Sequence, residues 1–187
     1  LFIHKDVGWA SISPDGNWLA YLSFDGWNIY VVRKDGTGSR QLTNEKYIPL
    51  FHEWSPDGKR IAFMSDRSGH REIWMIDADG SKLQQVTETR DIRADRVLWF
   101  PDGKKILVLE GVSRKMFQVD MTAPLPVRTL QPLLQSDSLG KRFYPASFSS
   151  NGKMIVGTVG DSTMSSAALY HMDSGILETL SDSLGIP

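Results

Sequence analysis

The sequence contains no cysteine, so neither a disulfide nor a thiolate metal site can stabilise the fold. It has no apolar run approaching the roughly 20 residues that a membrane-spanning helix needs. It also lacks an excess of one charge, because 21 Lys and Arg face 22 Asp and Glu. This balance gives no electrostatic reason to expect binding to nucleic acid or to an anionic membrane. Hydrophobic residues make up 41% of the 187 positions, which is typical of a globular domain.

The sequence also lacks the common catalytic and cofactor motifs. It has no G-x-S-x-G nucleophile elbow, no Walker loop and no G-x-G-x-x-G after a strand. The acidic turns at 66–72 and 77–80 lack the alternating oxygen ligands and terminal Glu of an EF-hand. The histidines are scattered without zinc-site spacing, at His4, His52, His70 and His171. We therefore predict no catalytic residue, no cofactor and no metal site, and expect that the chain is not an enzyme.

A four-residue turn recurs along the chain. "SPDG" ends at Gly16 and again at Gly58, "FPDG" ends at Gly103, and "SSNG" ends at Gly152. These glycines are 42, 45 and 49 residues apart. A period in the forties built from strands predicts the blades of a β-propeller, since four short strands take about 40–50 residues.

Each repeat predicts four strands. A short strand closes on an apolar residue before the turn, and an apolar strand such as "IAFM" follows three residues after each Gly. Because these second strands are apolar on both faces, we expect neighbouring sheets to cover both. The third strands are predicted to carry an aromatic residue in one shared register, namely Tyr30, Trp74, Phe117 and Tyr170. A polar fourth strand such as "RQLT" or "QQVT" fits an exposed outer edge.

The segment "WSPDGKRIAFMSDRSGHREIWMIDADGSKLQQVT", residues 54–87, resembles the TolB-type propeller repeat, a relative of the WD repeat. The first repeat matches it well, and the third and fourth keep parts of it. The resemblance implies an all-β fold of four-stranded antiparallel blades at about 1–43, 44–87, 88–135 and 136–187. The irregular region 124–139 is expected to be an insertion between blades.

The resemblance also implies a larger parent. TolB-like propellers have six or more blades, and "SDSLG" recurs at 181–185 where a fifth would start. The chain begins at Leu1 without an initiator Met or a signal-peptide pattern. We therefore expect part of a six- to eight-bladed propeller, with a closed four-bladed ring as the alternative. The family implies a periplasmic or otherwise extracytoplasmic location.

Three functions are compatible with this fold. The first is a non-enzymatic protein-binding scaffold or sensor module, whose partner is another protein or further blades of the parent chain. The second is the gating propeller of a prolyl-oligopeptidase-type serine peptidase whose catalytic domain is absent. The third is a lyase or hydrolase site in the propeller channel, for which the first strands offer only His52 and Glu53.

Partner contacts are expected on the loops that join strand two to three and one blade to the next, because both emerge on the same rim. Aromatic and Arg side chains dominate interface energetics. The candidate contact residues are Trp27, Tyr47, Arg67, His70, Arg90, Arg93 and Arg114. Of the six tryptophans, Trp27 alone falls outside the repeat registers, while Trp9 is expected to lie in the core.

Overall fold

The computed structural model describes residues 6–44, 50–89, 93–124, 129–133, 142–160 and 165–180. Its sixteen strands form four sheets of four antiparallel strands each, with the strands of every sheet in chain order. The first sheet contains β1 (Val7–Ile12), β2 (Trp18–Ser23), β3 (Asn28–Arg33) and β4 (Arg40–Gln41). The second contains β5 (Leu50–Trp54), β6 (Arg60–Ser65), β7 (Glu72–Asp77) and β8 (Gln84–Gln85).

The third sheet contains β9 (Ala94–Trp99), β10 (Lys105–Glu110), β11 (Met116–Asp120) and β12 (Gln131–Pro132). The fourth contains β13 (Arg142–Phe148), β14 (Met154–Gly160), β15 (Ser165–His171) and β16 (Leu177–Thr179). The short strand β12 lies inside the region 124–139, which was expected to be an insertion between blades. Within the described ranges, no helix is long and apolar enough to cross a lipid bilayer.

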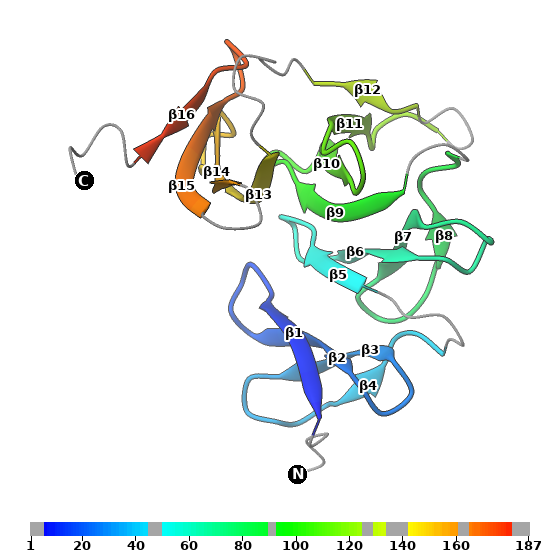
Figure 1. Cartoon of the computed structure of the whole chain (residues 1–187). Coiled ribbons are helices and arrows are strands. Elements are labelled where there is room, and N and C mark those ends of the chain that lie inside the picture. The colour runs from blue at the N-terminus through cyan, green and yellow to red at the C-terminus, as the bar shows by residue number, and fades with distance from the viewer. Residues whose placement is uncertain are drawn as a thin grey trace.

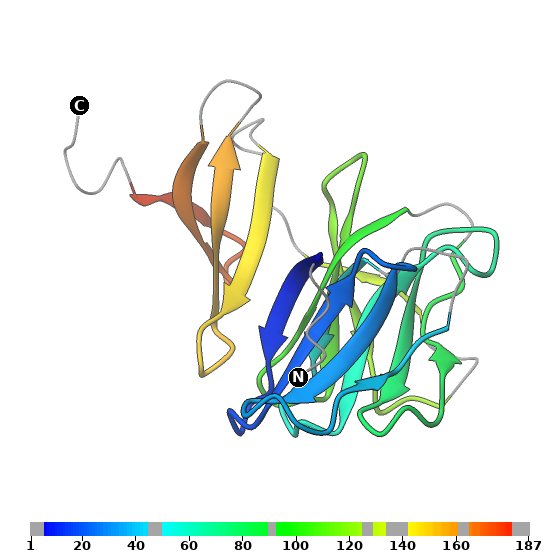
Figure 2. The ribbon, with the colours of Figure 1, turned by 90° about the horizontal axis from the view of Figure 1, so that it is seen from below.

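The four sheets are the blades of a propeller, as the repeat predicted. They follow one another along an arc, with β1, β5, β9 and β13 on its inner side and the short fourth strands outside (Figure 1). Figure 2 shows the same blades from below, with their strands running between two rims. The arc is open between the first and fourth blades, so the described part of the chain does not form the closed four-bladed ring that was the alternative.

Packing between successive blades buries the core. One apolar cluster joins the first blade to the second, another joins the second to the third, and a further one joins the third to the fourth. Neighbouring positions on β6 point to opposite sides: Phe63 packs toward the first blade and Met64 toward the third. Both are fully buried, which explains why β6 is apolar at every position from Ile61 to Met64.

The recurring turns also connect the blades. Ser13 Oγ donates a hydrogen bond to Asp15 Oδ1 and accepts one from the backbone N–H of Trp18, which closes the turn between β1 and β2. Gly58 adopts a φ of +67°, and a methyl group added there would lie 3.7 Å from Cδ of Pro14 in the preceding blade. Gly103 and Gly152 lie in the same way beside the prolines of the blades before them. One rim is therefore a row of turns in contact.

The fourth blade departs from the predicted register. Tyr170 pairs with Ile155, the residue three positions after the turn glycine, and so occupies the place that Val32 and Ile76 hold in the first two blades. The prediction that it aligns with Tyr30, Trp74 and Phe117 is wrong. Ala168 is the residue in that place, opposite Gly157. The ring of Phe143 fills the space over Gly157 and stacks on Tyr170, with ring centroids 6.1 Å apart.

The fourth blade is also covered on one face only. On β14, Ile155 and Val159 are buried against the third blade, whereas Val156 is 41% exposed. The expectation that every second strand is covered on both faces therefore fails here, because no described element packs against the far face of this blade.

Candidate functional site at the inner strands

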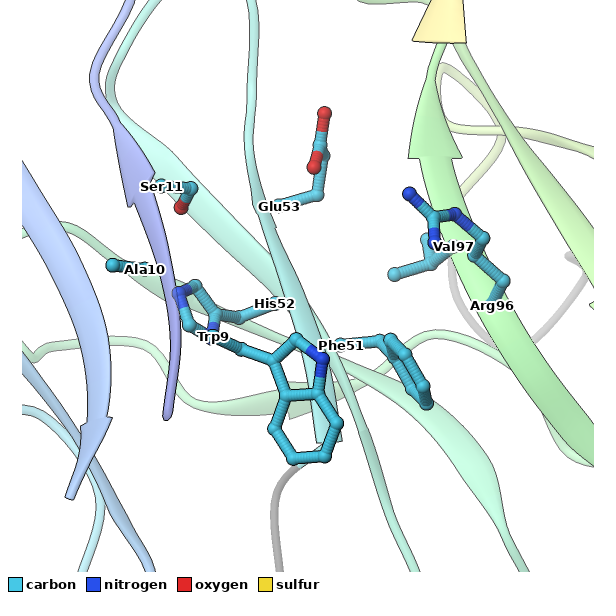
Figure 3. Close-up of a pocket in the computed structure, with 8 residues that line it drawn as sticks. All are labelled: Trp9, Ala10, Ser11, Phe51, His52, Glu53, Arg96 and Val97. Atoms are coloured by element: carbon cyan, nitrogen blue, oxygen red, sulfur yellow. The ribbon is translucent and has the colours of Figure 1, made fainter. Parts of the chain in front are cut away.

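A pocket of about 140 Å³ lies between the inner strands of the first three blades. It is shown in Figure 3. Strands β1, β5 and β9 supply its walls, so three blades must pack in register to form it. The residues that line it are Trp9, Ala10, Ser11, Phe51, His52, Glu53, Arg96 and Val97.

A β-bulge interrupts the pairing of each inner strand. On β1 it includes Trp9, and on β5 it includes Phe51. Both residues have positive φ angles, 37° for Trp9 and 47° for Phe51. Bulky side chains avoid this conformation, which costs on the order of 1–3 kcal/mol per residue and is concentrated at functional sites.

The two bulges bring the aromatic rings together. The centroids of Trp9 and Phe51 are 5.2 Å apart, and Trp9 is 49% exposed. The expectation that Trp9 belongs to the core is therefore wrong, because the bulge turns its side chain out of the sheet packing. Since Val7 pairs with Ser23 at the start of β1, Trp9 lies toward the rim that carries the β2–β3 loop and Trp27.

His52 lies beneath this aromatic pair. It is only 6% exposed, and its Nε2 is 3.1 Å from the carbonyl oxygen of Ala20 on the first blade. Burial lowers the pKa of His52 to about 4, so the imidazole is neutral at pH 7. Its Nδ1 has no hydrogen-bond partner among the described residues.

Glu53 and Arg96 lie on the side of the pocket between the second and third blades (Figure 3). Burial raises the pKa of Glu53 to about 7, and the positive charge of Arg96 opposes this shift only in part. Arg96 donates a hydrogen bond from Nη2 to the carbonyl oxygen of Ala146, 3.3 Å away on the fourth blade. The buried Nε of Arg96 has no acceptor among the described residues. The Oγ of Ser11, which also lines the pocket, has no hydrogen-bond partner among them either.

Several polar atoms of this pocket have no hydrogen-bond partner among the described residues. The pocket brings together the exposed Trp9 and the partly buried Phe51, a cation, a carboxyl group whose pKa is raised to about 7, and buried polar atoms without partners. Among the described residues no group of three His, Cys, Asp or Glu side chains is placed to hold a metal ion. The channel position for which the sequence offered only His52 and Glu53 thus has more members than the sequence indicated.

The predicted rim residues have different environments. Trp27, His70 and Arg93 are exposed; Trp27 has a φ of 54° and packs edge-on against Phe24, with ring centroids 4.9 Å apart. The Arg67 guanidinium lies 4.5 Å from the Trp74 ring centroid, and burial lowers the pKa of Arg67. Tyr47, Arg90 and His4 lie outside the described residues.

Arg114 connects blades. Its guanidinium Nη1 lies 2.5 Å from Asp95 Oδ2 on β9 and its Cζ 4.2 Å from the ring centroid of Tyr144 on β13. His171 also contacts a neighbouring strand, with its Nε2 3.3 Å from Glu178 Oε2.

Sequence reasoning missed Trp9, Phe51 and Arg96. A signal was present, because the aromatic residues fall at the start of two successive first strands, just before "ASISPDG" and "HEWSPDG". Their positive φ values could not be read from that pattern. No sequence signal marked Arg96, because the pocket residues beside it, His52 and Glu53, belong to another blade.

Four antiparallel four-stranded blades, the first three of which line a pocket with their inner strands, define a β-propeller. The chain belongs to the TolB beta propeller domain family, whose model matches residues 5–185. This confirms the resemblance seen in the second repeat.

Curated relatives share parts of the sequence. A TolB homolog of Chlorobium luteolum is 42% identical over 73 residues, which is 38% of this chain and 16% of that protein. An uncharacterized peptidase of Bacillus subtilis, YuxL, is 30% identical over 134 residues, which is 63% of this chain and 20% of that protein. The chain thus spans about a fifth or less of these two relatives.

Solved structures agree on the fold. TolB from Acinetobacter baumannii superimposes with a TM-score of 0.73 at 23% identity, covering 93% of this chain and 43% of that one. A puromycin-hydrolyzing peptidase of Mycobacterium tuberculosis superimposes with a TM-score of 0.70 at 18% identity, covering 96% of this chain and 29% of that one. At these identities the likeness shows the propeller fold alone.

Proposed function

We propose that this chain is a non-enzymatic, protein-binding propeller that holds a segment of a partner protein at the inner-strand pocket. The observation that carries the proposal is the Trp9–Phe51 pair, two aromatic residues held at positive φ, with Trp9 half exposed. Exposed aromatic side chains in a rigid frame lose little conformational freedom on binding and are frequent interface hot spots. The family match and the similarity to TolB proteins support a binding role and an extracytoplasmic location.

Site-specific photocrosslinking tests this function. A benzoylphenylalanine that replaces Trp9 in the full-length protein is expected to form one dominant crosslinked species in its native cells. A matched probe at Ile176, which is 56% exposed on the fourth blade, is the control and is expected to give none. Equal labelling from both positions, or no discrete species from position 9, would reject the pocket as the contact surface.

A second function is favoured by a specific observation. The similarity to a peptidase of Bacillus subtilis over 63% of the chain supports a propeller that accompanies a serine peptidase domain. In that case the full-length parent would react with a fluorophosphonate probe, and the reaction would be lost when the serine of a G-x-S-x-G motif is replaced. A parent protein without such labelling would leave the binding function alone.

A further inference from the structure

The unpartnered polar atoms of the pocket define the ligand that would complete it. A backbone carbonyl is only an acceptor, so the contact with Ala20 places the proton of His52 on Nε2. Nδ1 is then an acceptor, buried and without a donor. A ligand that completes the site must bring an N–H group to this atom, since a buried polar atom without a partner costs about 1–3 kcal/mol.

The opposite wall requires an acceptor. Arg96 forms no ion pair with any described residue, and its Nε lacks an acceptor. Glu53, the carboxyl group that lines the pocket with it, does not neutralise it fully at pH 7 because burial holds that group partly protonated. The wall therefore presents a positive charge together with a carboxyl O–H, and both suit a carboxylate.

We propose that this pocket binds the carboxy-terminal residue of a peptide, with the terminal carboxylate between Arg96 and Glu53, the backbone N–H directed to His52 and the side chain against Trp9 and Phe51. This inference rests on the proposed function and names the part of the partner that is recognised. The cavity of about 140 Å³ is smaller than the roughly 300–1,000 Å³ of a site that encloses a whole drug-sized ligand. It suits one terminal residue, with the preceding chain outside.

Binding of this kind depends on pH. A carboxyl–carboxylate hydrogen bond needs the proton on Glu53, which is lost as the pH rises through about 7, and the ionised group then repels the ligand. Other charged groups near Glu53 do not take over its part in this pH dependence. Strands β1 and β2 carry none. On β6, Arg60 lies over the ring of Trp99, and on β9, Asp95 is paired with Arg114.

Three small probes separate the contributions. N-acetyl-phenylalanine carries the carboxylate and the N–H, its carboxamide lacks the carboxylate, and 3-phenylpropionate lacks the N–H. We expect saturable chemical-shift changes in the indole resonance of Trp9 with the first probe at pH 6, and affinity at least about tenfold weaker for the carboxamide. The affinity for 3-phenylpropionate is expected to fall between the two.

Variants assign the contacts. Arg96→Gln is expected to weaken binding of N-acetyl-phenylalanine at least about tenfold, while Ile176→Ser, at an exposed site on the fourth blade, leaves it unchanged. The wild-type affinity is expected to be about tenfold weaker at pH 8 than at pH 6, and Glu53→Gln, whose amide can donate at both values, to remove this difference. Thermal melts of each variant confirm that it is folded.

Equal affinity for the acid and its carboxamide would overturn the proposal, as would the absence of a saturable change at about 10 mM acid, a concentration that still detects millimolar binding. If Arg96→Gln fails to fold, the pH dependence of the wild type and of Glu53→Gln decides instead. A crosslink from position 9 without binding of the acid would leave the protein-binding function standing and reject only the carboxy-terminal specificity.

Discussion

The second and fourth blades are built from the same repeat but differ in what surrounds them. The second blade has a neighbour on each side, and its apolar residues enter two separate clusters. The fourth blade contributes to one cluster only. Equivalent positions therefore have opposite fates: Met64 is 1% exposed on β6, whereas Thr158, in the same place on β14, is exposed.

The difference teaches that a strand in this fold is shaped by its neighbours more than by its own propensity. Strand β6 is apolar from Ile61 to Met64, and both of its faces are buried there. On β14 buried and exposed positions alternate, as in a sheet with one solvated face. The burial pattern of a blade's second strand thus follows the number of its faces that are covered, and apolar composition alone does not give that number, since Val156 on β14 is 41% exposed.

The largest expected effect comes from removing a side chain that only the second blade buries. Met64→Ala is expected to lower the free energy of unfolding by about 2–5 kcal/mol, because it leaves a cavity between the second and third blades. The matched change Thr158→Ala on the fourth blade is expected to stay within about 0.5 kcal/mol. Urea denaturation of both variants measures the contrast. Similar losses would show that the exposed face of the fourth blade is buried in solution.

The second prediction concerns two glycines of the fourth blade. A methyl group on Gly157 would lie 2.1 Å from the carbonyl oxygen of Tyr144 and 2.7 Å from the ring of Phe143. Gly157→Ala is therefore expected to cost about 3 kcal/mol or more, since backbone must move. Gly152→Ala, at a φ of +70° where a methyl group would meet only Pro101 at an ordinary contact distance of 3.5 Å, is expected to cost about 1–2 kcal/mol.

Chemical denaturation compares the two glycine variants. The ratio of the two losses tests the register of the fourth blade, because Phe143 lies over Gly157 only in the pairing described here. Equal losses for the two variants would place Phe143 elsewhere and would restore Tyr170 to the predicted aromatic register.

The third prediction uses pH to separate two contributions to stability. His52 lies where the second blade meets the first, and Glu53 lies where it meets the third. His52 has a folded pKa of about 4, below its ordinary value, so its contribution to stability is complete above about pH 6.5 and is lost as the pH falls toward 4. Glu53 has a folded pKa of about 7, above its ordinary value, so its contribution is complete below about 4.5 and is lost as the pH rises through 7. The two slopes oppose each other.

Between pH 7 and pH 5 each group contributes about 2 kcal/mol of opposite sign, so these two nearly cancel in the wild type. Glu53→Gln is expected to lose about 2 kcal/mol more than the wild type on acidification, and His52→Gln, which retains a donor for Ala20, to gain by a similar amount. Urea midpoints at the two pH values measure both. Parallel pH profiles for all three proteins would mean that neither group is buried as described.

Much of the fold could be predicted because each repeat contains a turn motif that marks where its strands end and begin. The turns ending at Gly16, Gly58, Gly103 and Gly152 fix where each second strand begins, and Pro and Gly act there through local backbone geometry. The fourth register could not be predicted by matching aromatic residues, because Phe143 substitutes for an aromatic residue on another strand. The strand pairing of Gly157 decides this point, and pairing is not local.

The candidate site was harder to predict than the fold. His52 and Glu53 were noted, but their partners Trp9 and Arg96 come from other blades, and contacts between blades leave no spacing in the sequence. Bulges add to this difficulty, since the turning out of Trp9 depends on one residue of extra length in the ladder. The rim residues Trp27 and His70 remain predictions, as their exposure permits contact without showing it.

The smallest expected effect contrasts a partly buried ion pair of the third blade, whose arginine also contacts the fourth blade, with an ion pair at the surface. Arg114 pairs with Asp95 and covers Tyr144, so Arg114→Ala removes a partly buried charge pair and a cation–π contact between the third and fourth blades. We expect a loss of about 1–2 kcal/mol in the free energy of unfolding.

The control is a surface ion pair. Nζ of Lys82 lies 3.0 Å from Asp77 Oδ2 with the lysine side chain 79% exposed, and Lys82→Ala is expected to change stability little. Thermal melts at low and at 0.5 M salt, about the range over which screening becomes strong, test both, because only the surface pair should be sensitive. If the effect of Arg114→Ala on stability depended on salt, water would reach the contact between these blades. The apolar cluster alone would then hold the fourth blade to the third.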